Sequence, residues 1–298
     1  MESIHLAVKD FLHDCRRRVS PNTLSYYDSA LRAFTEHCQT HGIEHVEDLT
    51  RRSVRQYAES LDGILSPGGA HARLRALRVF IKWAMREELL ATSPLPHALM
   101  PKVPQPELEV VTPTEMQALL TASKGRRMPL RNKAILLTLF DTGLRASELC
   151  GLQIKDLLPD STLYVRLGKG AKDRRVPVSK PTRRAIQAYV DKERPRTDRT
   201  TLFLSQTGGP LTTSGLRQLL EHLCEDAGIP IKTPHAFRRG FAVSFVKHGA
   251  DLVRLRDALG HTTVTMSTRY AVMSTEDLKE LHREASPVMH LGRKGRED

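Results

Sequence analysis

The stretch PHAFRRGFAVSFVKHGADLVRLRDALGHTTVTMSTRY, residues 234–270, gathers four side chains suited to one kind of chemistry. These side chains are His235, Arg238, His261 and Tyr270. His235 and Arg238 are three residues apart, so they share one face of a predicted helix. Gly249 and Gly260 are predicted helix stops that fold the segment back on itself. The arginine and histidines can hold a phosphate group, and the tyrosine can attack it.

Two upstream motifs add to this set. TGLRASEL at 142–149 follows a predicted apolar helix from Leu130 to Leu139 that Gly143 ends, so Arg145 emerges just past a helix end. LGKGAKDRRVPV at 167–178 places Lys169 in a predicted hairpin turn. A single histidine or tyrosine is ordinarily a surface or core residue. The specificity therefore comes from the complete set and its order.

This set resembles the tyrosine recombinases, the site-specific DNA recombinases of the phage integrase and Xer type. The resemblance rests on R in TGLR-x-SEL, K in a GKG turn, H-x-x-R, LGH, and Y nine residues after that histidine. It covers residues 112–284, and the N-terminal half resembles the family's core-binding domain in its helical pattern. The catalytic residues that the resemblance implies are Arg145, Lys169, His235, Arg238, His261 and Tyr270.

The chemistry follows from these residue types. Attack on a phosphodiester builds negative charge, which the planar forks of Arg145 and Arg238 can stabilise. Tyr270 is the expected nucleophile and His235 the expected general base. Lys169 resembles the family's hairpin lysine and is the expected general acid for the leaving 5′ oxygen. His261 is expected to bond the phosphate or to support the nucleophile. The product is a 3′-phosphotyrosine that keeps the bond energy, so no ATP or other cofactor is expected.

Composition and charge favour a polyanionic partner. The net charge is +12, and residues 106–298 hold 32 Lys/Arg against 22 Asp/Glu, whereas residues 1–105 hold 14 against 12. Basic composition alone would also fit an RNA-binding protein, but aromatic residues are only 5% and follow no base-stacking pattern. No zinc-type histidine spacing or acidic cluster for magnesium is evident, which disfavours a metal-dependent nuclease.

The same data suggest where the protein works. The cysteines have no C-x-x-C spacing and are predicted to be reduced thiols; they are Cys15, Cys38, Cys150 and Cys224. No signal peptide and no apolar run long enough to span a membrane are evident. A cytoplasmic protein without a membrane partner is therefore expected.

The N-terminal half predicts four helices with short connections, at about residues 3–18, 21–41, 51–61 and 67–90. In the last of these helices, a basic stripe lies beside the apolar face: Arg75, Arg78, Lys82 and Arg86. One interpretation is a solvated charged face. The other is a helix that lies along DNA, with these residues on phosphates or groove edges.

The domain organisation follows from a proline-rich segment. Residues 91–111 contain five prolines and little periodicity, so they predict a semi-rigid linker. We therefore expect a four-helix core-binding domain at 1–90, a catalytic domain at 112–284, and a tail at 285–298. The predicted fold class is mainly α with a small antiparallel β-sheet, the second domain being α+β.

Within the second domain, Thr112, Pro113 and Glu115 predict a capped helix start. Residues 162–167 and 174–178 predict two strands, and further helices are expected at 181–193, 212–227 and 274–284. Leu202 to Leu204 is expected to be a short strand or an extended link. Basic residues beside the hairpin turn are expected to take neighbouring phosphates: Lys172, Arg174 and Arg175.

Double-stranded DNA is the expected partner, and a tetramer on DNA is expected because exchange breaks four strands. Residues 274–298 are predicted to dock on a neighbouring subunit, the alternative being packing on their own domain. Two alternatives to a recombinase stay open at this level, and so does the choice of reaction within the family. One is a type IB topoisomerase-like enzyme and another is a catalytically silent DNA-binding regulator. Within the family, a chromosome-dimer resolvase and a mobile-element integrase share the same layout, so integration, excision and resolution are not distinguished.

Overall fold

The structure is a computed structural model that describes residues 1–95, 109–166 and 173–260. The chain divides into two compact units, Met1–Pro106 and Glu107–Asp298, called here the N-terminal and C-terminal units. The division falls inside the predicted proline-rich linker. The predicted limits of the linker, the catalytic domain and the tail stay predictions.

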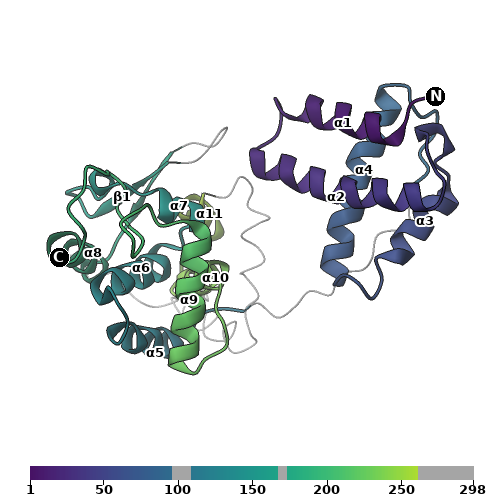
Figure 1. Cartoon of the computed structure of the whole chain (residues 1–298). Coiled ribbons are helices and arrows are strands. Elements are labelled where there is room, and N and C mark those ends of the chain that lie inside the picture. Colours follow the sequence, from purple (N-terminus) through teal and green to yellow (C-terminus); the bar gives the residue numbers. More distant parts are fainter. Residues whose placement is uncertain (96–108, 167–172, 261–298) are drawn as a thin grey trace, which may run out of the picture. The chain divides into compact units, whose positions relative to one another are not determined.

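The N-terminal unit is a bundle of four α-helices (Figure 1): α1 (Ile4–Cys15), α2 (Pro21–Thr40), α3 (Arg51–Ser60) and α4 (Pro67–Arg86). A short 3-10 turn, Val46–Asp48, precedes α3. The starts of α2 and α4 are as predicted, because Ser20 and Ser66 each accept a backbone N–H and a proline follows. The α4 helix ends earlier than predicted, at Arg86, since Glu88 takes a left-handed conformation without the help of a glycine.

The core of this unit is apolar and aromatic. Phe11 packs edge-on against Phe80 and Trp83, with ring centroids 5.8 and 5.7 Å apart. The apolar face of α4, which was predicted beside the basic stripe, is buried: Leu74, Leu77, Ile81 and Ala84. Apolar periodicity alone thus builds this bundle.

The C-terminal unit contains helices α5 (Pro113–Lys124), α6 (Pro129–Thr142), α7 (Ala146–Gly151), α8 (Lys180–Lys192), α9 (Thr213–Ala227), α10 (Pro234–Lys247) and α11 (Leu252–Leu259). It also contains a 3-10 turn, Ile154–Asp156, and an antiparallel pair of strands, β1 (Thr162–Val165) and β2 (Arg174–Pro177). The predicted fold class, mainly α with a small antiparallel sheet, is confirmed.

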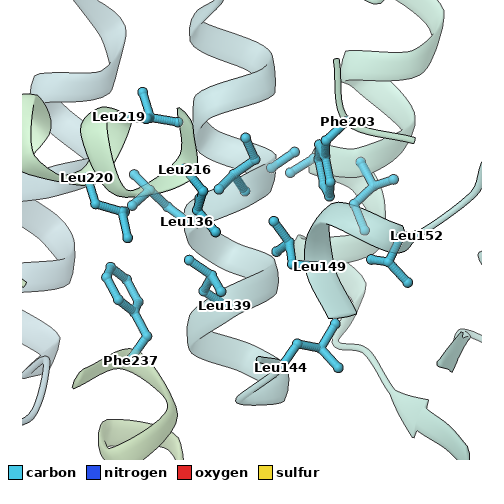
Figure 2. Packing of buried hydrophobic residues seen from close by; sticks show 14 of the residues in the cluster. Leu136, Leu139, Leu144, Leu149, Leu152, Phe203, Leu216, Leu219, Leu220 and Phe237 are labelled. Carbon is cyan, nitrogen blue, oxygen red and sulfur yellow. The ribbon is translucent and has the colours of Figure 1, made fainter. Parts of the chain in front are cut away.

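Helix α6 is the centre of this unit and contacts α5, α8 and α10 (Figure 1). Figure 2 shows Leu136 and Leu139 of α6 in the same buried cluster as Leu216 and Leu220 of α9 and Phe237 of α10. The predicted capping box is present, with reciprocal hydrogen bonds between Thr112 and Glu115.

Of two predictions for the connecting segments, one differs in detail from the structure and the other agrees with it. The strand β1 ends at Val165, two residues before the predicted limit. Residues 202–204 form a link rather than a strand, which is one of the two predicted alternatives, with isolated bridges at Thr201 and Leu204. The predicted hairpin turn and the predicted helix at 274–284 lie outside the described residues.

Among the described residues, no helix is long and apolar enough to cross a membrane. All four cysteines are free, as predicted. Burial raises the pKa of the Cys38 thiol to about 12 and that of Cys150 to about 11. These thiols are therefore protonated and poorly reactive near neutral pH.

Candidate active site

Helix α10 carries two of the predicted site residues. Pro234 occupies its first turn, and His235 and Arg238 follow three residues apart. Arg238 is buried, with 3% of its surface exposed. Its Nη1 donates to the carbonyl oxygen of Gly143 and its Nη2 to that of Leu259, both at 2.7 Å. The guanidinium thus binds the last carbonyls of α6 and α11, where the helix dipoles favour a positive charge.

Gly143 makes this geometry possible. It ends α6 in the left-handed conformation, with φ +59°. A Cβ at this position would lie 2.8 Å from Phe241 Cδ1 and 3.0 Å from Leu259 Cδ2. A side chain is therefore disfavoured by both conformation and space, and the chain turns at Gly143 so that Arg145 is the N-cap of α7.

Arg145 is the second arginine of the site. Its Nη1 donates to Glu148 Oε1 at 2.7 Å, and its Nη2 donates to the carbonyl oxygen of Gly260 at 3.3 Å. About a third of its side chain is exposed (34%). Arg145 and Arg238 therefore meet at the C-terminal end of α11, directly before His261 in the chain.

Glu148, the acidic residue of the TGLRASEL motif, is a central group that was not predicted as a site residue. Its side chain is 5% exposed and binds both Arg145 and Arg174. Burial alone would raise the pKa of Glu148, but hydrogen bonds from Arg174 and Arg145 outweigh burial and lower it to about 2. The carboxylate is thus ionised throughout the physiological range. Its signal in the sequence is an acid three residues after Arg145, in the first turn of α7.

The side chain of Arg174 points in a different direction from the one predicted. We expected it to face neighbouring phosphates, but its side chain is 9% exposed and turns inward from β2. Its Nη1 and Nη2 bind the two carboxylate oxygens of Glu148 at 3.0 and 2.9 Å, and its Nε donates to the carbonyl oxygen of Ala258 at 3.1 Å. All three nitrogens of the guanidinium bind groups within the protein, so we do not propose Arg174 as a DNA contact.

His235 is exposed, in contrast to Arg238. Partial desolvation lowers the pKa of His235, and the positive charges of Arg238, Arg239, Arg145 and Arg217 lower it further. The ring is therefore neutral near pH 7, the form in which an imidazole can accept a proton.

Several predicted residues lie outside the described part of the chain: Lys169, Lys172, His261 and Tyr270. The structure consequently brings together Arg145, His235 and Arg238 only. Near the hairpin, Arg175 is exposed, and its Nη1 lies 3.7 Å from Asp160 Oδ2.

On α4 of the N-terminal unit, Arg75, Lys82 and Arg86 are exposed and Arg78 is half-buried. Arg75 lies over the Tyr26 ring, and Arg86 pairs with Asp14 at 3.4 Å. Within residues 1–95, 109–166 and 173–260, no group of three or more His, Cys, Asp or Glu side chains could hold a metal ion.

This helical scaffold with its paired arginines belongs to a known class of DNA-acting proteins. The Phage integrase family matches residues 109–276, and the Phage integrase, N-terminal SAM-like domain matches residues 8–88. The chain belongs to the phage integrase family, the tyrosine recombinases. Members of this family are DNA breaking-rejoining enzymes that act in site-specific DNA recombination.

The relatives span nearly the whole chain. Tyrosine recombinase XerC of Halalkalibacterium halodurans is 31% identical over 90% of this chain and 92% of its own length. Tyrosine recombinase XerD of the same organism is 29% identical over 96% of this chain and 99% of its own length. Tyrosine recombinase XerD of Mycobacterium tuberculosis is 31% identical, again over 96% of this chain and 99% of its own length. The chain is thus about equally similar to the XerC and XerD types.

Solved structures share the fold. The Tn1549 transposon integrase in complex with a circular intermediate DNA has a TM-score of 0.80 at 20% identity, covering 96% of this chain and all of that one. A lambda integrase dimer bound to a COC′ core site has a TM-score of 0.74 at 18% identity, covering 90% and 77%. The predicted family is confirmed by the family models and by the Xer relatives.

Proposed function

We propose that this protein is a site-specific tyrosine recombinase that cleaves and rejoins duplex DNA through a 3′-phosphotyrosine intermediate. One observation carries the proposal. Arg145 and Arg238 are both held against the C-terminal end of α11, and the chain leads from that end to His261 and Tyr270. Arg238 and the proposed nucleophile Tyr270 thus belong to one continuous segment of the chain, and Arg145 binds that segment at the carbonyl oxygen of Gly260.

In the proposed reaction, the Tyr270 hydroxyl attacks the scissile phosphorus. Its proton passes to His235, which is neutral near pH 7 because its pKa is lowered. Arg145 and Arg238 donate to the non-bridging oxygens, where negative charge grows. The bond to the 5′ oxygen breaks, and Lys169 protonates that leaving oxygen while His261 bonds the phosphate or supports the nucleophile. A 5′ hydroxyl of another strand reverses the attack and completes the exchange.

Duplex DNA is the proposed partner. Four residues of the α4 stripe are proposed to contact it (Arg75, Arg78, Lys82 and Arg86), together with Lys172 and Arg175 near the hairpin. Four strands must be broken to exchange two duplexes, so we propose a tetramer on DNA. The Xer recombinases and the Tn1549 integrase match this chain over similar lengths, so the likeness supports the shared strand-exchange step and does not favour integration over resolution.

The test is covalent capture of DNA from a random-sequence duplex pool. After denaturation, DNA that stays attached to wild-type protein is sequenced, and we expect it to share one motif. Tyr270→Phe should retain no covalent DNA, because the phenol oxygen is the nucleophile. It should still bind the selected duplex under native conditions, because that oxygen contributes little to affinity.

Tyr164→Phe is the matched control. Tyr164 is another tyrosine of the C-terminal unit, and its hydroxyl binds Asp173 at 2.5 Å. This control variant should form the adduct normally. Covalent DNA on the Tyr270→Phe protein, or its loss from Tyr164→Phe alone, would contradict the assignment of the nucleophile.

A further inference from the structure

Arg174 joins three segments that are far apart in the sequence. It is the first residue of β2, it binds Glu148 of α7 with both Nη nitrogens, and it binds the carbonyl oxygen of Ala258 in α11 with its Nε. Strand β2 also packs directly against α11. One guanidinium therefore connects the hairpin to α7 and to the last turn of α11.

The end of α11 is shaped around this side chain. Gly260 closes the helix in the left-handed conformation, with φ +64°. A Cβ at Gly260 would lie 2.8 Å from Arg174 Nη1 and 3.1 Å from its Cζ. The absence of a side chain at Gly260 thus lets Arg174 reach across to Glu148.

The charge balance explains what Arg174 contributes. Glu148 is a buried carboxylate, and a buried charge without partners is costly. Arg174 supplies a planar two-point partner, which leaves Arg145 to share its guanidinium between Glu148 and the carbonyl oxygen of Gly260. Without Arg174, Arg145 would be the sole arginine partner of Glu148 and would be drawn toward it.

We propose that Arg174 is a positioning residue: it fixes Arg145 and the end of α11 relative to the hairpin, so that the groups acting on the scissile phosphate share one geometry. This inference rests on the proposed function. In the chain, Lys169 precedes Arg174 by five residues and His261 directly follows Gly260. Arg174 itself does not touch DNA in this account.

The first test needs no DNA. Amide hydrogen exchange should accelerate in Arg174→Ala at the Arg145 N–H, which donates to Glu148 Oε2 at 2.9 Å, and in the last turn of α11, residues 256–260. Arg183→Ala is the matched control, because Arg183 also anchors the hairpin but at its opposite end. Its Nη1 donates to the carbonyl oxygens of Leu158 and Pro159 and to Ser161 Oγ. Faster exchange in that variant should stay near residues 158–162.

The second test measures single-turnover cleavage of the duplex recovered in the covalent selection. Arg174→Ala should cleave about 100-fold more slowly at saturating protein, because small misplacements of reacting groups have effects of this size. Its Kd for the duplex should hardly change. Arg183→Ala should cleave at close to the wild-type rate.

A pH profile separates positioning from general destabilisation. When Arg174 is lost, burial should raise the pKa of Glu148. The acidic limb of the pH profile of the cleavage rate should therefore move to higher pH in Arg174→Ala. Arg174→Lys keeps the charge but cannot span two oxygens of Glu148 and a carbonyl at once. It should keep the wild-type acidic limb and an intermediate rate, and it stands in for Arg174→Ala if that protein does not fold.

The outcomes are distinct. Unchanged exchange at Arg145 and in α11, a wild-type cleavage rate, or an equal loss in Arg183→Ala would each overturn the role of Arg174. If wild-type protein captures no covalent DNA, the proposed function fails, and the exchange comparison still decides whether Arg174 holds these segments.

Discussion

The two units of the chain differ in the polar and charged side chains that they bury. In residues 1–95 the buried polar side chains are Thr35 and Ser53, and no Asp, Glu, Lys or Arg is buried. In the described part of the C-terminal unit, charged residues from five separate segments are buried: Arg131, Glu148, Asp156, Lys232 and Arg238. The first unit depends on apolar packing, whereas the second holds ionised groups in fixed positions.

Three of the buried charges of the C-terminal unit, those of Glu148, Asp156 and Lys232, are each paired with an opposite charge. Asp156 binds Arg166 with both carboxylate oxygens, and Lys232 Nζ lies 2.8 Å from Glu115 Oε1. Such pairs add little net stability, because desolvation offsets their attraction, but breaking one is costly. A network of this kind specifies geometry more than it stabilises, which suits a unit that must preorganise charge for catalysis.

The largest expected effect is on core stability. Phe80→Ala should destabilise the N-terminal unit by about 3–5 kcal/mol, because it empties the space beside Phe11 and Trp83. Trp83 is the single tryptophan, so its fluorescence reports urea unfolding of this unit. Amide exchange in α6, which reports the C-terminal unit, should not change.

Phe203→Ala is the reciprocal variant. Phe203 is fully buried and stacks on Tyr189 with centroids 5.8 Å apart. This variant should accelerate exchange in α6 and leave the Trp83 transition in place. If either variant changed both the Trp83 unfolding transition and the amide exchange in α6, the two units would not unfold independently. That result would contradict the comparison of the two units.

The sequence predicted the N-terminal unit because its core is periodic. The apolar face of α4 and the starts of α2 and α4 follow from local signals in the sequence, and both were predicted. The same kinds of signal placed Arg145 past the end of α6 and His235 beside Arg238. The end of α4 was missed, because the left-handed residue there is Glu88 rather than glycine.

The network around Glu148 could not be predicted in the same way. Arg174 lies 26 residues from Glu148 in the chain, and its alternating strand pattern gives no indication of which charge it meets. A basic residue beside a hairpin turn is ordinarily solvated, so an outward Arg174 was the natural expectation. In the folded chain β2 packs against α11, and Arg174 faces Glu148 and the carbonyl oxygen of Ala258.

Acid should act differently on the two units. The pKa of Glu148 falls from its ordinary 4.5 to about 2 in the folded protein, which corresponds to about 3 kcal/mol. Because the folded pKa is depressed, this contribution is fully present above about pH 4.5 and is lost as the pH falls toward about 2. Exchange in α6 should therefore show that the C-terminal unit loses more stability to acid in this window than the N-terminal unit does.

Glu148→Gln checks the cause. This variant should be less stable at neutral pH, and its difference from wild type should shrink as the pH falls through the same window. Glu221→Gln, at an exposed position of α9, serves as control and should follow the wild-type curve. An acid dependence that survives unchanged in Glu148→Gln would show that another group causes it.

The central claim is that the C-terminal unit holds its arginines to neutralise a scissile phosphate. Its most direct measurement compares Arg145→Ala with wild type on the selected duplex and on the same duplex with an uncharged methylphosphonate at the scissile position. On ordinary DNA, Arg145→Ala should cleave about 100- to 1,000-fold more slowly, as expected for one lost charge-stabilising donor. On the methylphosphonate duplex the loss should largely disappear, since there is less charge to stabilise. An equal loss on both duplexes would contradict the account and would make Arg145 a structural residue.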